Sequence, residues 1–153
     1  MGIIVAGTDG SDGARAALAW ALDEARRRNA SLHVVHAWEM PVTAYPGPYF
    51  GARGIDIEAG LEAYRTNAEE LGSEIRSWLA ANGKDVTTSV SVLEGAATAK
   101  LLEAATEADL LVLGARGHGG FSALLLGSVS DRCTRDAPCT VVIVPADERA
   151  AGA

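Results

Sequence analysis

Residues 2–13 read GIIVAGTDGSDG, an apolar run that passes directly into a turn. Residues 2–7 are apolar without alternation, which is typical of a strand buried on both faces of a sheet. Residues 8–13 are rich in glycine, aspartate and hydroxyl side chains, which favour turns and helix N-termini. Beyond them, small apolar residues recur at helical spacing as far as Ala25, and arginines at 26–28 stand where the helix dipole favours positive charge. The stretch therefore predicts a buried strand, a tight turn and an amphipathic helix.

The same alternation of short apolar runs and longer amphipathic segments continues along the chain. Residues 39–56, rich in proline, glycine and aromatic residues, are predicted to form a long loop of the kind that is often functional or mobile. Strands that alternate with helices imply right-handed crossovers between parallel strands. We therefore predict an α/β fold, a doubly wound three-layer domain around a five-stranded parallel sheet. The further strands are expected at 32–38, 85–93, 109–114 and 139–144, with helices at 57–82 and 95–106 and a last helical segment that ends at Asp136.

Length, charge and cysteine content limit the classes of protein to which the chain can belong. Its 153 residues fit one domain, which we expect over residues 1–146, followed by a frayed tail at 147–153. The net charge of −7 argues against a nucleic-acid partner and against an anionic membrane surface, both of which attract positive charge. No apolar stretch approaches the ~20 residues that span a bilayer, and Cys133 and Cys139 form no C-x-x-C pair. We therefore expect reduced thiols and a cytoplasmic protein.

The chemically informative segment is glycine-rich and follows the fourth expected strand. Residues 114–120 read GARGHGG, and residues 127–130 read GSVS. Glycines in the first stretch allow positive φ and let backbone N–H groups approach an anion. Gly127 and Ser128 would open the last helix, whose N-terminal N–H groups suit phosphate oxygens, and the hydroxyls of Ser128 and Ser130 can add hydrogen bonds. The segment predicts a polyphosphate site; the alternative is a tight connection in which Ser128 is an ordinary N-cap.

Other phosphate-binding signatures are not found. The sequence has no G-x-x-x-x-G-K-[ST], and no G-x-G-x-x-G follows the first expected strand. His33 and His36 stand three apart on a strand, so they point to opposite faces and cannot share a metal. We expect both histidines to pack in the core or at an edge, and we expect no protein metal site.

The spacing Gly114-x2-Gly117-x9-Gly127-Ser128 matches the G-x2-G-x9-G-[S/T] motif of the ATP-binding branch of the universal stress proteins. The sequence resembles that family over nearly its whole length. Ala115 and Thr140 depart from it, because family members often carry Ser and Pro there. The matching segments are 4–11, 34–37, 117–121, 124–130 and 137–139.

The resemblance implies strand order 3-2-1-4-5 and a site for ATP, with Mg²⁺ carried by its phosphates. Asp9 matches an acidic residue close to adenine and ribose, and Ala37 matches a position whose backbone contacts adenine. Asp9 has the alternative of capping the first helix or stiffening its turn, and His118 that of a solvated loop histidine. The implied nucleotide-binding residues are Gly7, Asp9, Ala37, Gly114, Ala115, Arg116, Gly117, His118, Gly119, Gly120, Gly127, Ser128, Val129 and Ser130.

The function implied is a nucleotide-dependent regulatory or stress-response module with a protein partner that the sequence does not name. No residue set resembles a water activator with an acid and a base, so we expect no catalytic residues and at most weak ATP hydrolysis. The alternatives are a slow ATPase or adenylating enzyme, and a dimeric interaction protein without nucleotide. The choice among ATP, ADP, AMP and a cyclic nucleotide stays open. Residues 141–144 form an apolar edge strand, and because the family commonly dimerises through it, we expect a C2 homodimer.

Overall fold

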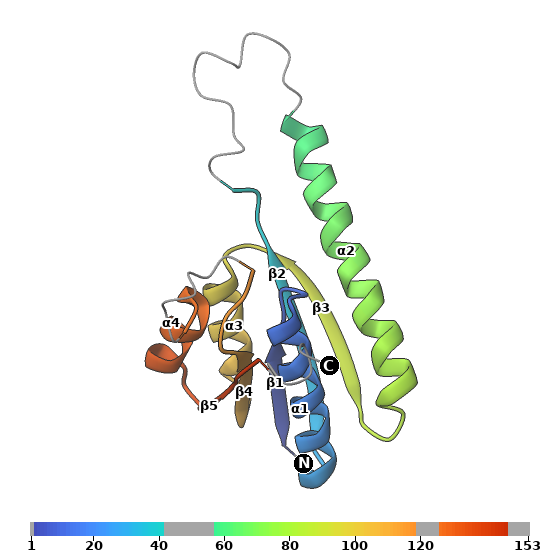
Figure 1. The fold of residues 1–153 in the computed structure, drawn as a ribbon, viewed down its shortest axis with the longest axis vertical. Coiled ribbons are helices and arrows are strands. Elements are labelled where there is room, and N and C mark those ends of the chain that lie inside the picture. Colours follow the sequence, from blue (N-terminus) through green and yellow to red (C-terminus); the bar gives the residue numbers. More distant parts are fainter. Residues whose placement is uncertain (1, 42–56, 119–125, 147–153) are drawn as a thin grey trace.

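The computed structural model describes residues 2–41, 57–118 and 126–146, and these form one five-stranded sheet with helices on both faces (Figure 1). All strand pairs are parallel, and the order is β3-β2-β1-β4-β5, as expected. The expected long loop lies outside the described residues from 42 to 56, as does the tail at 147–153. The strands are β1 (Ile3–Gly7), β2 (Ser31–Trp38), β3 (Thr88–Glu94), β4 (Leu110–Gly114) and β5 (Thr140–Val144), and the helices are α1 (Asp12–Arg28), α2 (Ile57–Asn82), α3 (Ala97–Ala105) and α4 (Ser128–Asp136).

The sheet separates two hydrophobic cores, and β1 contributes to both. Ile4 and Ala6 point to the core under α1 and α2, whereas Val5 points to the core under α3 and α4. β1 lies between β2 and β4, so its backbone is paired at both edges. This two-sided burial explains why the strand is apolar without alternation, and it confirms the expectation from the sequence.

Both ends of α1 lie at residues that typically cap helices. Ser11 is the N-cap, and its Oγ accepts a hydrogen bond from the backbone N–H of Ala14 at 3.3 Å. Asn29 ends the helix in the left-handed conformation, with φ 54°. β3 begins at Thr88, three residues later than expected, because Val86 N–H bonds to the carbonyl of Gly83 in a turn.

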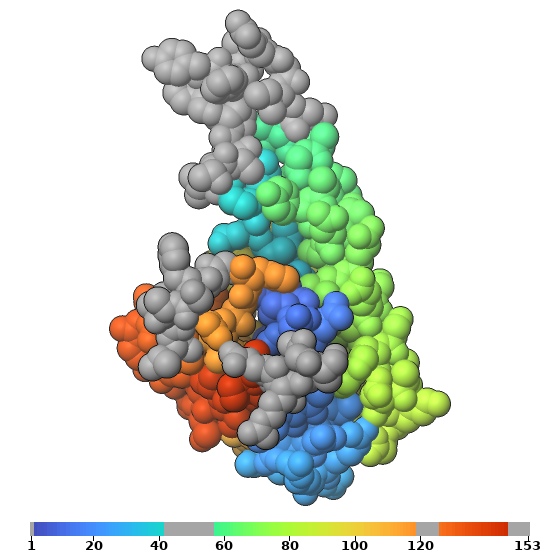
Figure 2. Space-filling view, viewed as in Figure 1, coloured from blue at the N-terminus to red at the C-terminus, as the bar shows by residue number. Residues whose placement is uncertain are grey.

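Helix α2 runs past the end of the sheet (Figures 1 and 2), and its buried residues lie between Ala68 and Leu79. The expected apolar face is buried at Ala68 and Ile75, but Ile57 is 42% exposed and Tyr64 is 37% exposed. Arg65, on the projecting half, stacks over the ring of Trp38 at 5.9 Å from its centroid. No helix in the described ranges is long and apolar enough to cross a membrane.

Candidate functional site

A pocket of about 570 Å³ opens at the carboxyl ends of β1, β2 and β4. β1 and β4 are neighbours although β2 follows β1 in the chain, so this is the point where the strand order reverses. Ligands of open α/β sheets bind at such points. Val35, Leu101 and Leu113 give the pocket an apolar part, and Gly114, residues 116–118 and the first turn of α4 give it a polar part.

Asp9 stands in the turn after β1 and accepts two backbone hydrogen bonds. Its Oδ1 accepts from the N–H of Ser11 at 3.0 Å, and its Oδ2 accepts from the N–H of His118 at 3.1 Å. Partial burial raises the pKa of Asp9, but the hydrogen bonds from Ser11 and His118 outweigh it and hold the pKa below its ordinary value. Asp9 is therefore ionised at neutral pH. It stiffens the turn and faces the pocket, whereas the cap of α1 is Ser11.

His118 joins the glycine-rich segment to the β1 turn a second time. Its Nε2 lies 2.9 Å from the backbone carbonyl oxygen of Asp9, so this nitrogen carries the proton and donates. On the other side of the turn, Nδ1 of the buried His36 donates to the carbonyl of Thr8 at 2.9 Å. The turn that carries Asp9 is therefore hydrogen-bonded to β2 on one side and to the segment after β4 on the other.

Of the two roles expected for the glycines of the motif, positive φ and close approach of backbone N–H groups to an anion, the structure bears on the first. Among the described residues the glycines with positive φ are Gly10 and Gly95, so Gly114 and Gly117 do not need glycine for their backbone angles. Close approach requires them instead. A Cβ on Gly114 would lie 2.9 Å from the carbonyl carbon of Gly13, and a Cβ on Gly117 would overlap Asp9 Oδ2. The expectation of left-handed glycines at 114 and 117 was wrong.

Helix α4 presents its N-terminus to the pocket without a side-chain cap. Gly127 is the N-cap residue, so the alternative in which Ser128 caps the helix was wrong. Ser128 and Val129 line the pocket. The buried Ser130 also lines it, but its Oγ donates to the carbonyl of Gly114 at 2.6 Å, so its proton is directed at the protein. The free N–H groups of the first turn are left to a ligand or to water.

Most residues expected in the site meet in this pocket. Ala115 does not line it; its N–H extends the sheet by bonding to the carbonyl of Val144, and its carbonyl accepts from Gly127. Gly119 and Gly120 lie outside the described residues. The expected residues that line the pocket are Gly7, Asp9, Ala37, Gly114, Arg116, Gly117, His118, Gly127, Ser128, Val129 and Ser130.

The sequence reasoning missed the apolar wall of the pocket. Val35 and Leu113 are inward residues of β2 and β4, and Ala97 and Leu101 belong to the first turns of α3. Val35, Leu101 and Leu113 are also core residues, as their periodicity indicates, so the pattern carries no separate signal for a ligand. Only the strand order shows that these positions surround a pocket.

The described residues hold no cluster of three or more His, Cys, Asp or Glu that is arranged to bind a metal ion. Cys133, on the inner face of α4, is fully buried, and burial raises the pKa of its thiol, so it is a packed side chain rather than a thiolate ligand. Any cation in the pocket would have to be held mainly by a ligand.

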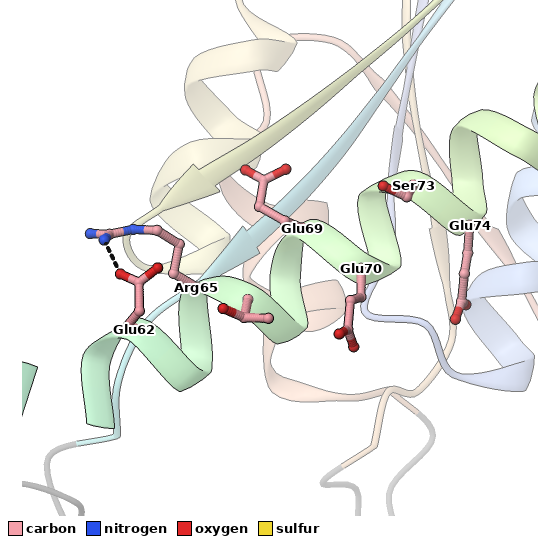
Figure 3. Close-up of a pocket in the computed structure, with 7 residues that line it drawn as sticks. Glu62, Arg65, Glu69, Glu70, Ser73 and Glu74 are labelled. Atoms are coloured by element: carbon pink, nitrogen blue, oxygen red, sulfur yellow. Dashed lines mark hydrogen bonds and ion pairs between the residues drawn. The ribbon is translucent and has the colours of Figure 1, made fainter. Parts of the chain in front are cut away.

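A second hollow of about 530 Å³ lies along α2 (Figure 3). Arg65 pairs with Glu62 at 2.7 Å, and the other lining groups are carboxylates and hydroxyls of the same helix. Figure 3 shows these side chains leaving the helix in different directions. Groups from one helix that do not converge make a poor binding site, so the pocket at the strand ends is the candidate.

Comparisons with known proteins bear on this geometry. Residues 1–145 match the model of the universal stress protein family. The Thermus aquaticus "universal stress protein in QAH/OAS sulfhydrylase 3' region" is 37% identical over 139 residues, which are 89% of this chain and 93% of that protein. A universal stress protein of Mycobacterium tuberculosis is 33% identical over 142 residues, which are 92% of this chain but 44% of that protein. The chain thus spans less than half the length of this mycobacterial relative.

Solved structures share the fold over almost the whole chain. UspA of Lactobacillus plantarum superposes with a TM-score of 0.77 at 24% identity, covering 94% of this chain and 97% of its own. A universal stress protein solved in complex with cAMP has a TM-score of 0.66 at 27% identity, covering 95% of this chain and 98% of its own.

Proposed function

The chain belongs to the universal stress protein family, and from this we propose that it binds ATP in the pocket at the carboxyl ends of β1, β2 and β4. The observation that carries the proposal is the N-terminus of α4. It has no side-chain cap, and it faces the same pocket as Gly114 and residues 116–118. Free N–H groups at the positive end of a helix dipole are suited to phosphate oxygens.

The rest of the pocket supports a nucleoside. Val35, Leu101 and Leu113 offer an apolar wall for a base, and Ala37 at the end of β2 leaves room for backbone contacts with it. A volume of about 570 Å³ falls in the range of small-molecule sites. The relative in complex with cAMP supports an adenine nucleotide as the class of ligand.

Mg²⁺ fits this site only as a companion of the nucleotide. Asp9 is the carboxylate that the described residues place in the pocket, and one carboxylate is typical of sites where the metal is held chiefly by substrate phosphates and water. Bound Mg²⁺ would neutralise charge on the phosphates; Asp9 and the α4 N-terminus orient the ligand.

The biological role proposed is a cytoplasmic, nucleotide-dependent regulatory module of the stress response. The carboxylate of Asp9 and the Nε2 of His118, which line the pocket, are both engaged in hydrogen bonds to the protein backbone, and this supports stoichiometric binding with slow or no turnover. The proposal includes a homodimer through residues 141–144, and an unidentified protein partner would read the bound state.

The first experiment identifies nucleotide released from denatured, freshly purified protein and then titrates the emptied protein with MgATP, AMP and cAMP. We expect ATP at close to one equivalent per chain. Absence of both bound nucleotide and uptake of all three would overturn the proposal. Tight binding of cAMP alone would replace ATP by a cyclic nucleotide.

A matched pair of variants tests the role of the α4 N-terminus. Ser128→Asp places a negative charge in the first turn of α4, which the helix dipole tolerates or favours, but which repels a phosphate. We expect its affinity for MgATP to fall by about tenfold or more with unchanged thermal stability. Ser128→Asn has similar size and no charge, and we expect it to bind within about threefold of the unmodified protein. Equal binding by the two variants would place the phosphates elsewhere.

A further inference from the structure

The contact between the β1 turn and the β4 segment is made by protein atoms alone. Asp9 Oδ2 accepts from His118 N–H at 3.1 Å, and His118 Nε2 donates to the Asp9 carbonyl at 2.9 Å. Asp9 Oδ1 is held in place by Ser11 N–H at 3.0 Å. The carboxylate is therefore oriented by its own turn and offers its second oxygen to a segment 109 positions away.

The glycines at the start of the motif leave the space that this contact needs. Gly117 does not have positive φ, and a Cβ there would overlap Asp9 Oδ2. Nearby, a Cβ on Gly13 would lie 3.0 Å from the carbonyl oxygen of Arg116, and Gly114 packs on the backbone of Gly13. The first half of the motif thus lets residues 9–14 and 114–118 approach each other closely, whereas Gly127 is surrounded only at 3.5 Å and beyond.

We propose that Asp9 is a positioning residue that holds residues 116–118 where they line the pocket, and that position 117 is glycine because of this carboxylate. The effect on ligand affinity rests on the proposed nucleotide function, whereas the contact itself does not. A segment held in its binding conformation before the ligand arrives loses less conformational freedom on binding. His36 completes the arrangement from β2, because its bond to Thr8 holds the turn in which Asp9 stands.

A double-mutant cycle separates this role from simple contacts with the ligand. The four proteins are the unmodified chain, Asp9→Ala, Gly117→Ala and the double variant, each titrated with MgATP. If position 117 is glycine because of Asp9, we expect Gly117→Ala to weaken binding by about tenfold or more when Asp9 is present and by less than about threefold when it is absent. If Asp9 and Gly117 act on the nucleotide independently, the two effects will multiply, and that outcome would overturn the inference.

Gly127→Ala is the matched control. It removes a glycine of the same motif, but its Cβ would meet no atom of Asp9 and its φ of −69° suits alanine. We expect its effect on MgATP affinity to be the same, within about twofold, with and without Asp9.

A measurement on the nucleotide-free protein tests the contact between Asp9 and His118 separately from nucleotide binding. We expect the backbone N–H of His118 to exchange with solvent at least about fivefold faster in Asp9→Ala than in the unmodified protein, because its acceptor is removed. Residue-resolved NMR of the nucleotide-free proteins measures this rate. An unchanged rate would overturn the inference even if ATP binds, whereas faster exchange in a protein that binds no ATP would retain the contact and reject only the nucleotide function.

Discussion

At the level of single residues, Asp9 links the ionisation of one carboxylate to the geometry of the site. Both of its oxygens accept backbone hydrogen bonds, and these favour the charged form. The pKa of Asp9 is therefore below its ordinary value in the folded protein despite partial burial. A lowered folded pKa means that the stabilisation is present at neutral pH and is lost as the pH falls through that value.

This sign gives a pH prediction. We expect the difference in unfolding free energy between the unmodified protein and Asp9→Asn to stay constant from about pH 8 to about pH 5 and to shrink below about pH 4. Urea denaturation at several pH values measures it. A difference that instead grows as the pH falls from about 7 to about 5 would mean that burial, which raises the pKa, outweighs the hydrogen bonds.

The reason for glycine at positions 114 and 117 could not be predicted from the sequence. The motif spacing drew attention to Gly114 and Gly117, but local sequence suggested positive φ as their reason. The true neighbours of these glycines are Gly13 and Asp9, about a hundred positions earlier in the chain. No local pattern reports such a contact, because it depends on β1 and β4 being neighbours in the sheet.

At the level of elements, the strands and helices follow from local patterns with boundary errors of a few residues. Buried runs predicted the strands, and the cluster of cap residues predicted the start of α1. The strand order came from the family resemblance, since apolar runs alone do not say which strand lies beside which. The apolar stripe of α2 was predicted to be one buried face, but its buried residues begin at Ala68, and Ile57 and Tyr64 are exposed.

The two halves of α2 should therefore differ in their contribution to stability. Ile75 is 5% exposed in the packed half, and we expect Ile75→Ala to lower the unfolding free energy by about 2–5 kcal/mol through lost burial and a cavity. Tyr64 is 37% exposed, and we expect Tyr64→Ala to change it by only about 0.5 kcal/mol. Urea denaturation compares them. Equal losses would mean that the projecting half is covered in solution.

At the level of the whole molecule, β5 is an edge strand of the sheet that the described residues form. The Val144 carbonyl accepts from Ala115 N–H on the β4 side. Alternate residues direct their peptide groups to opposite edges of a strand, so the N–H of Ile143 faces outward. Val141 to Val144 are only half-buried in one chain, which is the state expected of a strand that a partner covers.

The proposed homodimer has a matched test at this edge. Ile143→Pro removes the outward N–H while leaving the bonds to β4, and proline is tolerated in edge strands. Ile143→Ala removes the same packing but keeps the N–H. We expect Ile143→Pro to sediment as a monomer at concentrations where Ile143→Ala is dimeric. Dimers of both variants would exclude strand pairing through β5 as the interface.

The pairing of β1 with β4 has a consequence for biosynthesis. Ile4 pairs with Leu110, and Asp9 meets His118, so one edge of β1 stays open while the ribosome adds about a hundred further residues. When only β1, α1 and β2 have emerged from the ribosome, the nascent chain contains part of the pocket but not the N-terminus of α4. Because contacts this distant in sequence form late and slowly, the proposed nucleotide site is incomplete on the growing chain. The open edge of β1 is therefore exposed before any nucleotide could bind there.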